Sequence, residues 1–310
     1  MRVASLLASA TEIVCALGLE DRLVAISHEC DYPPAILDRP RVSRPRFRVD
    51  GLTSGQIDAA VRGAMATHGG VYELDEPALR AARPDLILTQ QVCEVCAVPT
   101  SLARAAAAAL DDGAVVLSLD AHTIEGILDS VLQIAGATGA SERGAALVAG
   151  WRDRLRAVEA AVRGAEPPRT LAVEWLDPVF TPGHWVPEMI SLAGGANLAG
   201  TPARRSAQVD WADLADLDPD VLLVMPCGYG LAQSRAEADA HADRLRALAP
   251  RAVAGGKAFV LDGSAYFNRS GPRIVDGVEI LAALLHPDRV ADVALEGRAA
   301  RWMPLESVGQ

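Results

Sequence analysis

Short apolar runs alternate along this chain with longer stretches in which apolar residues recur at helical spacing. Runs such as Leu23–Ile26 and Leu86–Thr89 are apolar on both faces, which is typical of parallel strands covered by helices on both sides. The same pattern predicts further strands at Val3–Leu7, Val115–Leu117, Leu171–Trp175, Val221–Met225 and Ala258–Leu261. It therefore predicts an α/β protein with mainly parallel sheets.

The segment from Thr123 to about Arg163 contains no proline, and its apolar spacing predicts a long helical connector. Residues 136–141 are expected to divide this helix, and Pro167 and Pro168 to end it. We therefore divide the chain into an N-terminal α/β lobe (1–120), a helical connector (121–166) and a C-terminal α/β lobe with a tail (167–310). Ligands of open α/β sheets bind beyond the carboxyl ends of the strands, so a ligand crevice is expected between the lobes.

Two phrases suggest that the lobes are divergent copies. Arg83-Pro84-Asp85 precedes one predicted strand, and Asp218-Pro219-Asp220 precedes another. Each reads as a helix end, a Pro-Asp turn and a buried strand.

The charge balance and the N-terminus limit the partners and the location. Among 310 residues, 29 are basic and 40 acidic, and the net charge of −11 would repel phosphate backbones, so nucleic acid is not an expected partner. The apolar N-terminal run is cut by Thr11 and Glu12, which favours a strand and a helix over a secretory signal. No apolar stretch is long enough for a membrane span, and we expect a cytoplasmic protein.

Aromatic residues make up only 4% of the chain, yet many of them follow predicted strands. These residues are Tyr32, Trp175, Phe180, Trp185, Tyr229, Tyr266 and Phe267. Loops that follow the strands of an α/β sheet carry its ligand contacts, so this distribution indicates a binding surface.

Several phrases carry a resemblance to a known family. They are Ala8–Glu12, Asp31–Pro34, Phe180–Gly183, Ser191–Asn197 and Arg269–Arg273. At these residues the chain resembles the helical-backbone (class III) substrate-binding proteins of ABC transporters, and in particular their cobalamin-binding branch. The resemblance implies two lobes bridged by a long helix, with cobalamin or a related corrinoid held between them.

The same resemblance implies ligand contacts from six residues: Tyr32, Trp175, Phe180, Tyr266, Phe267 and Arg269. A corrin is a broad apolar ring edged by amides, so flat aromatic surfaces and a few hydrogen-bond donors suit it. The alternative for Phe180 and Phe267 is that they are ordinary core residues. The resemblance also implies one glutamate on each lobe that docks onto a permease. Pro77 and Ala212 stand at those places, so docking is doubtful, although Glu76 and Asp213 lie next to them.

The cysteines leave three interpretations open. Cys93 and Cys96 form a C-x-x-C, Cys30 follows His28, and Cys227 ends another strand. They are either reduced pocket cysteines, or a zinc, iron or copper(I) site made by Cys93, Cys96, Cys30 and either His28 or Cys227, or thiols that react with a corrinoid cobalt. The odd count of five argues against a disulfide framework.

His184 is a candidate axial ligand for cobalt or iron, against a solvated loop histidine. The sequence lacks a phosphate loop, a nucleophile elbow and an H-E-x-x-H. We therefore expect a binding protein for cobalamin or a related corrinoid, without catalysis. The alternative is a metal- or thiol-dependent enzyme on the same scaffold, centred on Cys30, Cys93 and Cys96.

Overall fold

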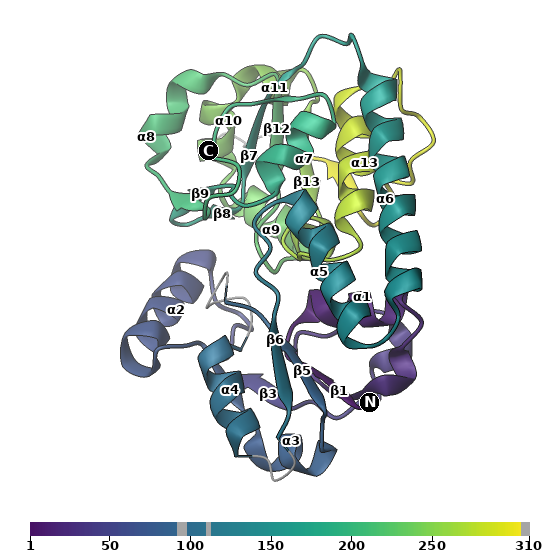
Figure 1. The fold of residues 1–310 in the computed structure, drawn as a ribbon. Coiled ribbons are helices and arrows are strands. Elements are labelled where there is room, and N and C mark those ends of the chain that lie inside the picture. Colours follow the sequence, from purple (N-terminus) through teal and green to yellow (C-terminus); the bar gives the residue numbers. More distant parts are fainter. Residues whose placement is uncertain (92–97, 110–112, 305–310) are drawn as a thin grey trace. The chain divides into compact units, whose positions relative to one another are not determined.

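The computed structural model describes residues 1–91, 98–109 and 113–304, drawn as a ribbon in Figure 1. The chain divides into two units. Unit 1 comprises Met1–Ala121, Glu125–Gly150 and Ser270–Pro272. Unit 2 comprises His122–Ile124, Trp151–Arg269 and Arg273–Gln310.

Unit 1 is built on a four-stranded parallel sheet in the order β2-β1-β5-β6. Its strands are β1 (Val3–Ser5), β2 (Leu23–Ile26), β5 (Leu86–Thr89) and β6 (Val115–Ser118). The central strands β1 and β5 are buried along their whole length, which explains why their sequences are apolar on both faces. The predicted strands at Leu23–Ile26 and Leu86–Thr89 are confirmed without change.

Helices flank the sheet of unit 1 on the segments between its strands. Helix α4 (Thr100–Ala108) packs against β5 and β6, and α1 (Ala8–Ala16) packs against β1 and β2. The remaining elements are α2 (Ser54–His68), α3 (Glu76–Ala82), the 3-10 turns at Glu20–Arg22 and Pro34–Ile36, and an antiparallel pair, β3 (Ser43–Pro45) and β4 (Tyr72–Leu74). Each parallel pair is therefore joined through helical segments, as parallel connections require.

The connector consists of two helices, α5 (Ile124–Ala137) and α6 (Ser141–Val162). The predicted division within residues 136–141 is confirmed, because the helices are interrupted at residues 138–140. Gly139 there has a left-handed backbone (φ 70°), which favours glycine. The division between the units falls inside α6, after Gly150.

Unit 2 is built on a five-stranded sheet in the order β10-β7-β12-β13-β14. Its strands are β7 (Arg169–Val173), β10 (Ala196–Asn197), β12 (Val221–Val224), β13 (Ala258–Leu261) and β14 (Ala299–Arg301). All pairs are parallel except β13 with β14, which is antiparallel. The predicted fold class is confirmed: an α/β chain with two mainly parallel sheets and a helical connector.

A second, antiparallel sheet follows β7 and was not predicted. It contains β8 (Trp175–Leu176), β9 (Val179–Thr181) and β11 (Ala207–Gln208), in the order β11-β9-β8. The predicted strand Leu171–Trp175 was too long, because β7 ends at Val173 and Trp175 already belongs to the hairpin. Strands of two or three residues are too short to show an alternating pattern.

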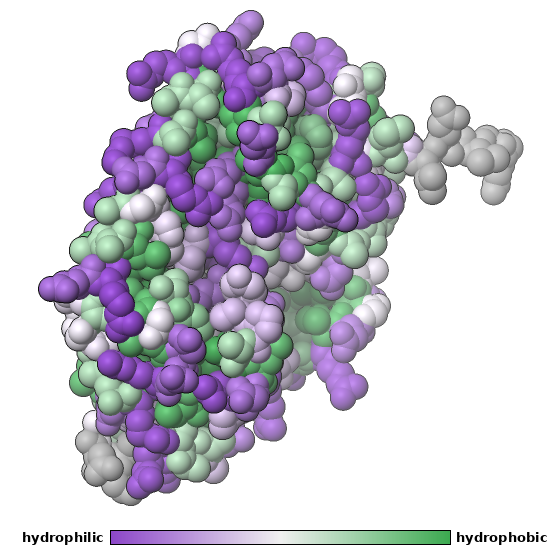
Figure 2. All heavy atoms as spheres, turned by 90° about the vertical axis from the view of Figure 1, so that its right-hand side faces the viewer, coloured by the Kyte–Doolittle hydropathy of each residue, from purple (hydrophilic) through white to green (hydrophobic). Residues whose placement is uncertain are grey.

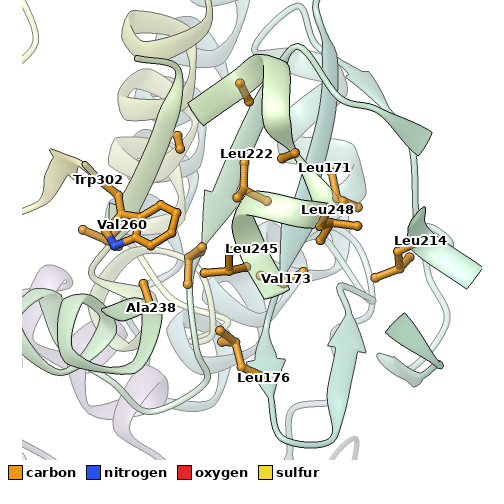
Figure 3. Packing of buried hydrophobic residues seen from close by; sticks show 14 of the residues in the cluster. Leu171, Val173, Leu176, Leu214, Leu222, Ala238, Leu245, Leu248, Val260 and Trp302 are labelled. Atoms are coloured by element: carbon orange, nitrogen blue, oxygen red, sulfur yellow. The ribbon is translucent and has the colours of Figure 1, made fainter. Parts of the chain in front are cut away.

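The helices of unit 2 include α7 (Val186–Leu192), which packs against α13 (Ile274–Leu285), and α9 (Leu231–Ala240), which packs against β13. The others are α8 (Trp211–Leu214), α10 (Ala242–Leu248), α11 (Pro250–Ala254), α12 (Gly263–Tyr266) and a 3-10 turn at Ala215–Leu217. Figure 3 shows the core between these elements, with Trp302 beside Val260. The Trp302 ring is fully buried, and its Nε1 donates to Asp239 Oδ1 at 2.8 Å.

The turn before β5 has a specific set of bonds in unit 1. Arg83 ends α3 with a left-handed backbone (φ 41°). The Asp85 carboxylate then accepts the backbone N–H of Arg2 at 2.7 Å. The Arg2 guanidinium donates to the carbonyl oxygen of Ala82 at 2.8 Å. These bonds tie the start of β1 to the turn that leads into β5.

The turn before β12 repeats these bonds in unit 2. Asp218 has a left-handed backbone (φ 35°), and the Asp220 carboxylate accepts the backbone N–H of Arg169 at 3.0 Å. The Arg169 guanidinium donates to the Leu217 carbonyl at 2.6 Å. The two Pro-Asp phrases therefore form the same local structure, as expected of divergent copies.

The surface mixes both kinds of residue. On the face drawn in Figure 2, groups of apolar residues lie among hydrophilic ones. Within the described ranges, every helix falls short of the length or the apolar character that crossing a bilayer requires.

Candidate functional site

Three partly exposed aromatic residues of unit 2 come together at strand ends. Trp175 and Phe180 lie directly opposite each other in the β8-β9 hairpin, so their side chains share one face. Tyr229, in the loop after β12, places its ring 5.3 Å from the Trp175 ring, at an interplanar angle of 59°. We call Trp175, Phe180 and Tyr229 the aromatic cluster.

Backbone and side-chain bonds hold this hairpin in place. The backbone of Glu174 accepts from the N–H of Cys227, and its buried carboxylate accepts the Ser206 hydroxyl at 2.5 Å. Strand β11, which follows Ser206, pairs with β9. Gly183 ends the Thr-Pro-Gly turn, where a Cβ would lie 2.3 Å from the Ser206 nitrogen. The turn therefore requires glycine, and the aromatic cluster rests on a fixed support.

Tyr229 was not among the predicted ligand contacts, although it was one of the aromatic residues that follow strands. Burial and the nearby charge of Glu237 raise the pKa of its hydroxyl. The hydroxyl is therefore protonated at neutral pH and can donate a hydrogen bond. Its position directly after β12 is the sequence feature that could have identified it.

A second group surrounds Tyr266 at the end of α12. The guanidinium carbons of Arg298 and Arg273 lie 5.4 and 5.8 Å from the centre of its ring, within the range of cation–π contacts. Burial is the main cause that raises the pKa of the Tyr266 hydroxyl. This place combines an aromatic ring, a hydroxyl donor and two cations.

The two neighbours of Tyr266 that were predicted as ligand contacts lie in different surroundings. The Phe267 side chain is fully buried, and its carbonyl oxygen accepts from Trp185 Nε1 at 2.7 Å. This burial matches the core-residue alternative, and Phe267 offers no surface to a ligand in this conformation. Arg269 is partly exposed and is the last residue of unit 2 before the segment Ser270–Pro272. Contact of either residue with a ligand stays a prediction.

In unit 1, Tyr32 is the exposed member of the predicted contacts, with 46% of its surface accessible. The other groups of this loop already have protein partners. His28 Nδ1 lies 2.8 Å from the Ser43 hydroxyl, and its Nε2 lies 3.1 Å from a Glu29 carboxylate oxygen. The buried Cys30 thiol lies 3.0 Å from the Thr11 hydroxyl.

The proposed metal site is not supported. Cys93 and Cys96 lie outside the described residues, so the convergence of Cys30 with them stays untested. Among residues 1–91, 98–109 and 113–304, no three His, Cys, Asp or Glu side chains are grouped so that they could hold a metal ion. Cys227 is exposed, next to the aromatic cluster.

Unit 1 also contains a pocket of about 340 Å³ between the end of α2 and the start of α4. It is lined by residues that include Arg46, His68, Tyr72, Pro99 and Leu102. Small-molecule sites commonly measure about 300–1,000 Å³, so this pocket alone suits a small solute and is too small for a macrocycle. None of the predicted ligand contacts lines it.

The fold and these strand-end groups can be compared with known proteins. A family described as periplasmic binding proteins matches residues 3–264. The chain belongs to the periplasmic binding protein family. Within it, the vitamin B12-binding protein of Vibrio cholerae is 25% identical over 286 residues, covering 92% of this chain and 88% of that protein.

Solved structures of periplasmic binding proteins agree with this fold. The periplasmic vitamin B12 binding protein BtuF of Vibrio cholerae has a TM-score of 0.66 and 24% identity, covering 92% of this chain and 96% of that one. The periplasmic haem binding protein HutB of the same species has a TM-score of 0.69 and 20% identity, covering 93% and 99%. These likenesses support the two-lobe, class III fold that the sequence predicted.

Family membership supports the binding of a small solute. The residues next to the expected docking positions are both exposed: Glu76 begins α3, and Asp213 lies in α8. The Asp213 carboxylate accepts the backbone N–H of Asp210 at 3.1 Å, so it also caps its own helix. Docking to a permease stays a prediction.

Proposed function

We propose that this periplasmic-binding-protein-family chain binds cobalamin or a related corrinoid and does not transform it. The observation that carries the proposal is the aromatic cluster of Trp175, Phe180 and Tyr229 at the strand ends of unit 2. It occurs in a chain that aligns along 92% of its length with a vitamin B12-binding protein.

The chemistry of the ligand fits these groups. The faces of a corrin are apolar, and partly exposed aromatic rings supply matching flat surface at little cost in side-chain entropy. The rim of a corrin carries amides, which accept hydrogen bonds from protonated hydroxyls. Tyr229 and Tyr266 both keep their hydroxyl protonated at neutral pH, because their pKa values are raised above the usual range.

Haem is the closest competing ligand, because it is also a flat apolar macrocycle. Its two carboxylates would favour the arginines beside Tyr266, whereas an amide-edged corrin depends on them less. We therefore expect Arg298→Gln to weaken haem binding more than corrinoid binding. This difference separates the two ligands within the same group of residues.

The enzyme alternative receives no support from the described residues. Its proposed centre includes Cys93 and Cys96, which lie outside them. A cytoplasmic location remains part of the proposal. Fractionation of cells that express the full chain tests it, and recovery of the protein from an exported fraction would contradict it.

The direct test is a visible-range titration of the purified full chain with cyanocobalamin, cobinamide and haem. We expect saturable binding of a corrinoid, weakened by Trp175→Ala. The matched control is Trp211→Ala, because Trp211 is also a partly buried tryptophan of unit 2 but stacks on Arg244 outside the aromatic cluster. The absence of any spectral or calorimetric change at high micromolar corrinoid would overturn the proposal, and binding of haem alone would replace corrinoid by haem.

A further inference from the structure

Two histidines of unit 2 that the aromatic cluster does not use face each other. His122 lies in the connection between β6 and α5, and His184 in the connection between β9 and α7. Their Nδ1 atoms lie 3.2 Å apart, and their ring centres lie 5.3 Å apart. The sequence gave His122 no distinguishing feature, since the two residues are 62 positions apart.

The spacing of these nitrogens suits a shared metal ion. Imidazole nitrogens bind zinc at about 2.0–2.1 Å, so two nitrogens 3.2 Å apart would subtend roughly 100° at the ion. That angle lies within the range that tetrahedral and octahedral coordination allow. The rings are therefore already close to the arrangement of a two-histidine chelate.

The backbone holds His184 in an uncommon conformation that points its ring to this place. Its φ is +51°, in the left-handed region that non-glycine residues seldom adopt. The N–H of His184 donates to the carbonyl of Arg204 at 2.5 Å, and its own carbonyl accepts the N–H of Ala203 at 2.9 Å. Strained backbone that is fixed from both sides is often found at functional sites.

The other side of the pair is fixed as well. The backbone N–H of Ile124, two residues after His122, donates to Glu188 Oε2 in α7 at 2.7 Å. The ring of Trp185, buried beneath this turn, lies 5.5 Å from the His184 ring. Both imidazoles therefore start from positions that α7 and its preceding turn determine.

The charge state of His184 also suits a metal ion. Burial, together with the nearby charges of His122 and Arg205, lowers the pKa of His184 to about 4. The ring is neutral at pH 7 and keeps a lone pair, which metal binding requires. A metal ion would replace the proton between the two Nδ1 atoms, and that proton would move to Nε2 of the same ring.

We propose that His122 and His184 together bind one divalent transition-metal ion that prefers imidazole, such as Ni²⁺, Cu²⁺ or Zn²⁺, with solvent in the remaining positions. This site is distinct from the cysteine site considered from the sequence and does not depend on corrinoid binding. The alternative is a plain hydrogen bond between the two rings.

The test is calorimetric titration of the full chain, free of any histidine tag and of corrinoid, with NiCl₂. We expect one site in the wild-type chain. His122→Gln and His184→Asn should each weaken it by at least about tenfold, since even groups one shell further from a metal commonly contribute that much. Asparagine is chosen at position 184 because it tolerates the left-handed backbone. His68→Gln, a substitution at an exposed histidine, is the control and should leave the affinity unchanged.

A spectroscopic reading supports the count of ligands. With Cu²⁺, the electron paramagnetic resonance spectrum should show hyperfine coupling to two imidazole nitrogens in the wild-type chain and to one in His122→Gln. Circular dichroism of each variant establishes that it is folded. The proposal is overturned if the wild-type chain binds no metal, or if both folded histidine variants bind it with unchanged affinity, which would place the metal on other groups.

Discussion

The two units share a frame and differ in one insertion. The parallel strands follow the order β2-β1-β5-β6 in unit 1 and β10-β7-β12-β13 in unit 2. In both, an aspartate after a Pro-Asp turn accepts the first N–H at the edge of the central strand. In unit 1, β1 leads into α1 after two residues, whereas in unit 2 the β8-β9 hairpin stands between β7 and α7.

The difference separates stability from chemistry. The shared bonds and buried strands form the frame, and variation there would act mainly on folding. The inserted hairpin carries Trp175 and Phe180, and the turn after it carries His184. Unit 2 therefore concentrates its candidate ligand contacts in the segment that unit 1 lacks at the corresponding place.

Unit 2 also extends its sheet with β14, and this extension should give the largest effect on stability. Trp302 follows β14, is fully buried and donates to Asp239. We expect Trp302→Ala to lower the free energy of unfolding by about 3–5 kcal/mol, because it leaves a large cavity. Urea denaturation measures this. Met303→Ala, at a neighbour that is 69% exposed, is the control and should change stability by less than about 0.5 kcal/mol. Equal effects would mean that β14 is not part of the cooperative core.

The contribution of each unit to ligand binding can be compared through one aromatic residue in each. Trp175 is partly buried against Tyr229, whereas Tyr32 of unit 1 is 46% exposed. Buried aromatic anchors commonly contribute about 1–3 kcal/mol to binding. We expect Trp175→Ala to weaken corrinoid binding near the upper end of that range and Tyr32→Ala near the lower end. Visible titration measures both, and a larger loss for Tyr32→Ala would reverse the assignment of the main contact to unit 2.

The frame was predictable from the sequence because it rests on local signals. Runs such as Leu86–Thr89 are apolar on both faces, and the glycines near 136–139 interrupt a helical pattern. The two Pro-Asp phrases also predicted equivalent turns. In each case the residues that specify the structure are adjacent in the chain.

The candidate site was less predictable because it depends on pairs distant in sequence. Trp175 and Tyr229 meet only after β7 and β12 pair, and the same holds for the histidine pair, whose members come from two different connections. The burial of Phe267 depends on how α12 packs under the turn of Trp185. Periodicity shows which residues end a strand but not which of them meet.

A smaller effect should come from the turn after the hairpin. The pKa of His184 is lowered to about 4, so between about pH 6.5 and 4 the unfolded chain binds a proton that the folded chain does not. The contribution is complete above pH 6.5 and is lost as the pH falls towards 4. Since the ring is only half-buried, we expect the loss to be about 1–2 kcal/mol.

His184→Asn isolates this contribution. The difference in unfolding free energy between wild-type and variant should shift in favour of the variant on going from pH 7.5 to pH 4.5. Urea denaturation at both pH values measures it, and His68→Asn, at an exposed histidine, serves as the control. A difference that does not change with pH would show that His184 titrates normally in the folded chain.

The smallest effect should come from the bonds that the two units share. Asp85 and Asp220 accept equivalent N–H groups, at 2.7 and 3.0 Å, but Asp220 also lies 3.3 Å from Arg251 and has the less exposed side chain, at 35% against 59%. A typical hydrogen bond contributes about 0.5–1.5 kcal/mol net. We therefore expect Asp220→Asn to lower the unfolding free energy by about 1 kcal/mol, and Asp85→Asn by about 0.5 kcal/mol, because asparagine keeps an acceptor but loses the charge. Denaturation at low and high salt decides between the two causes. If the stronger effect at Asp220 comes from Arg251, it should shrink as salt screens the ion pair. A difference that persists at high salt would instead show that burial makes the turn of unit 2 the stiffer copy.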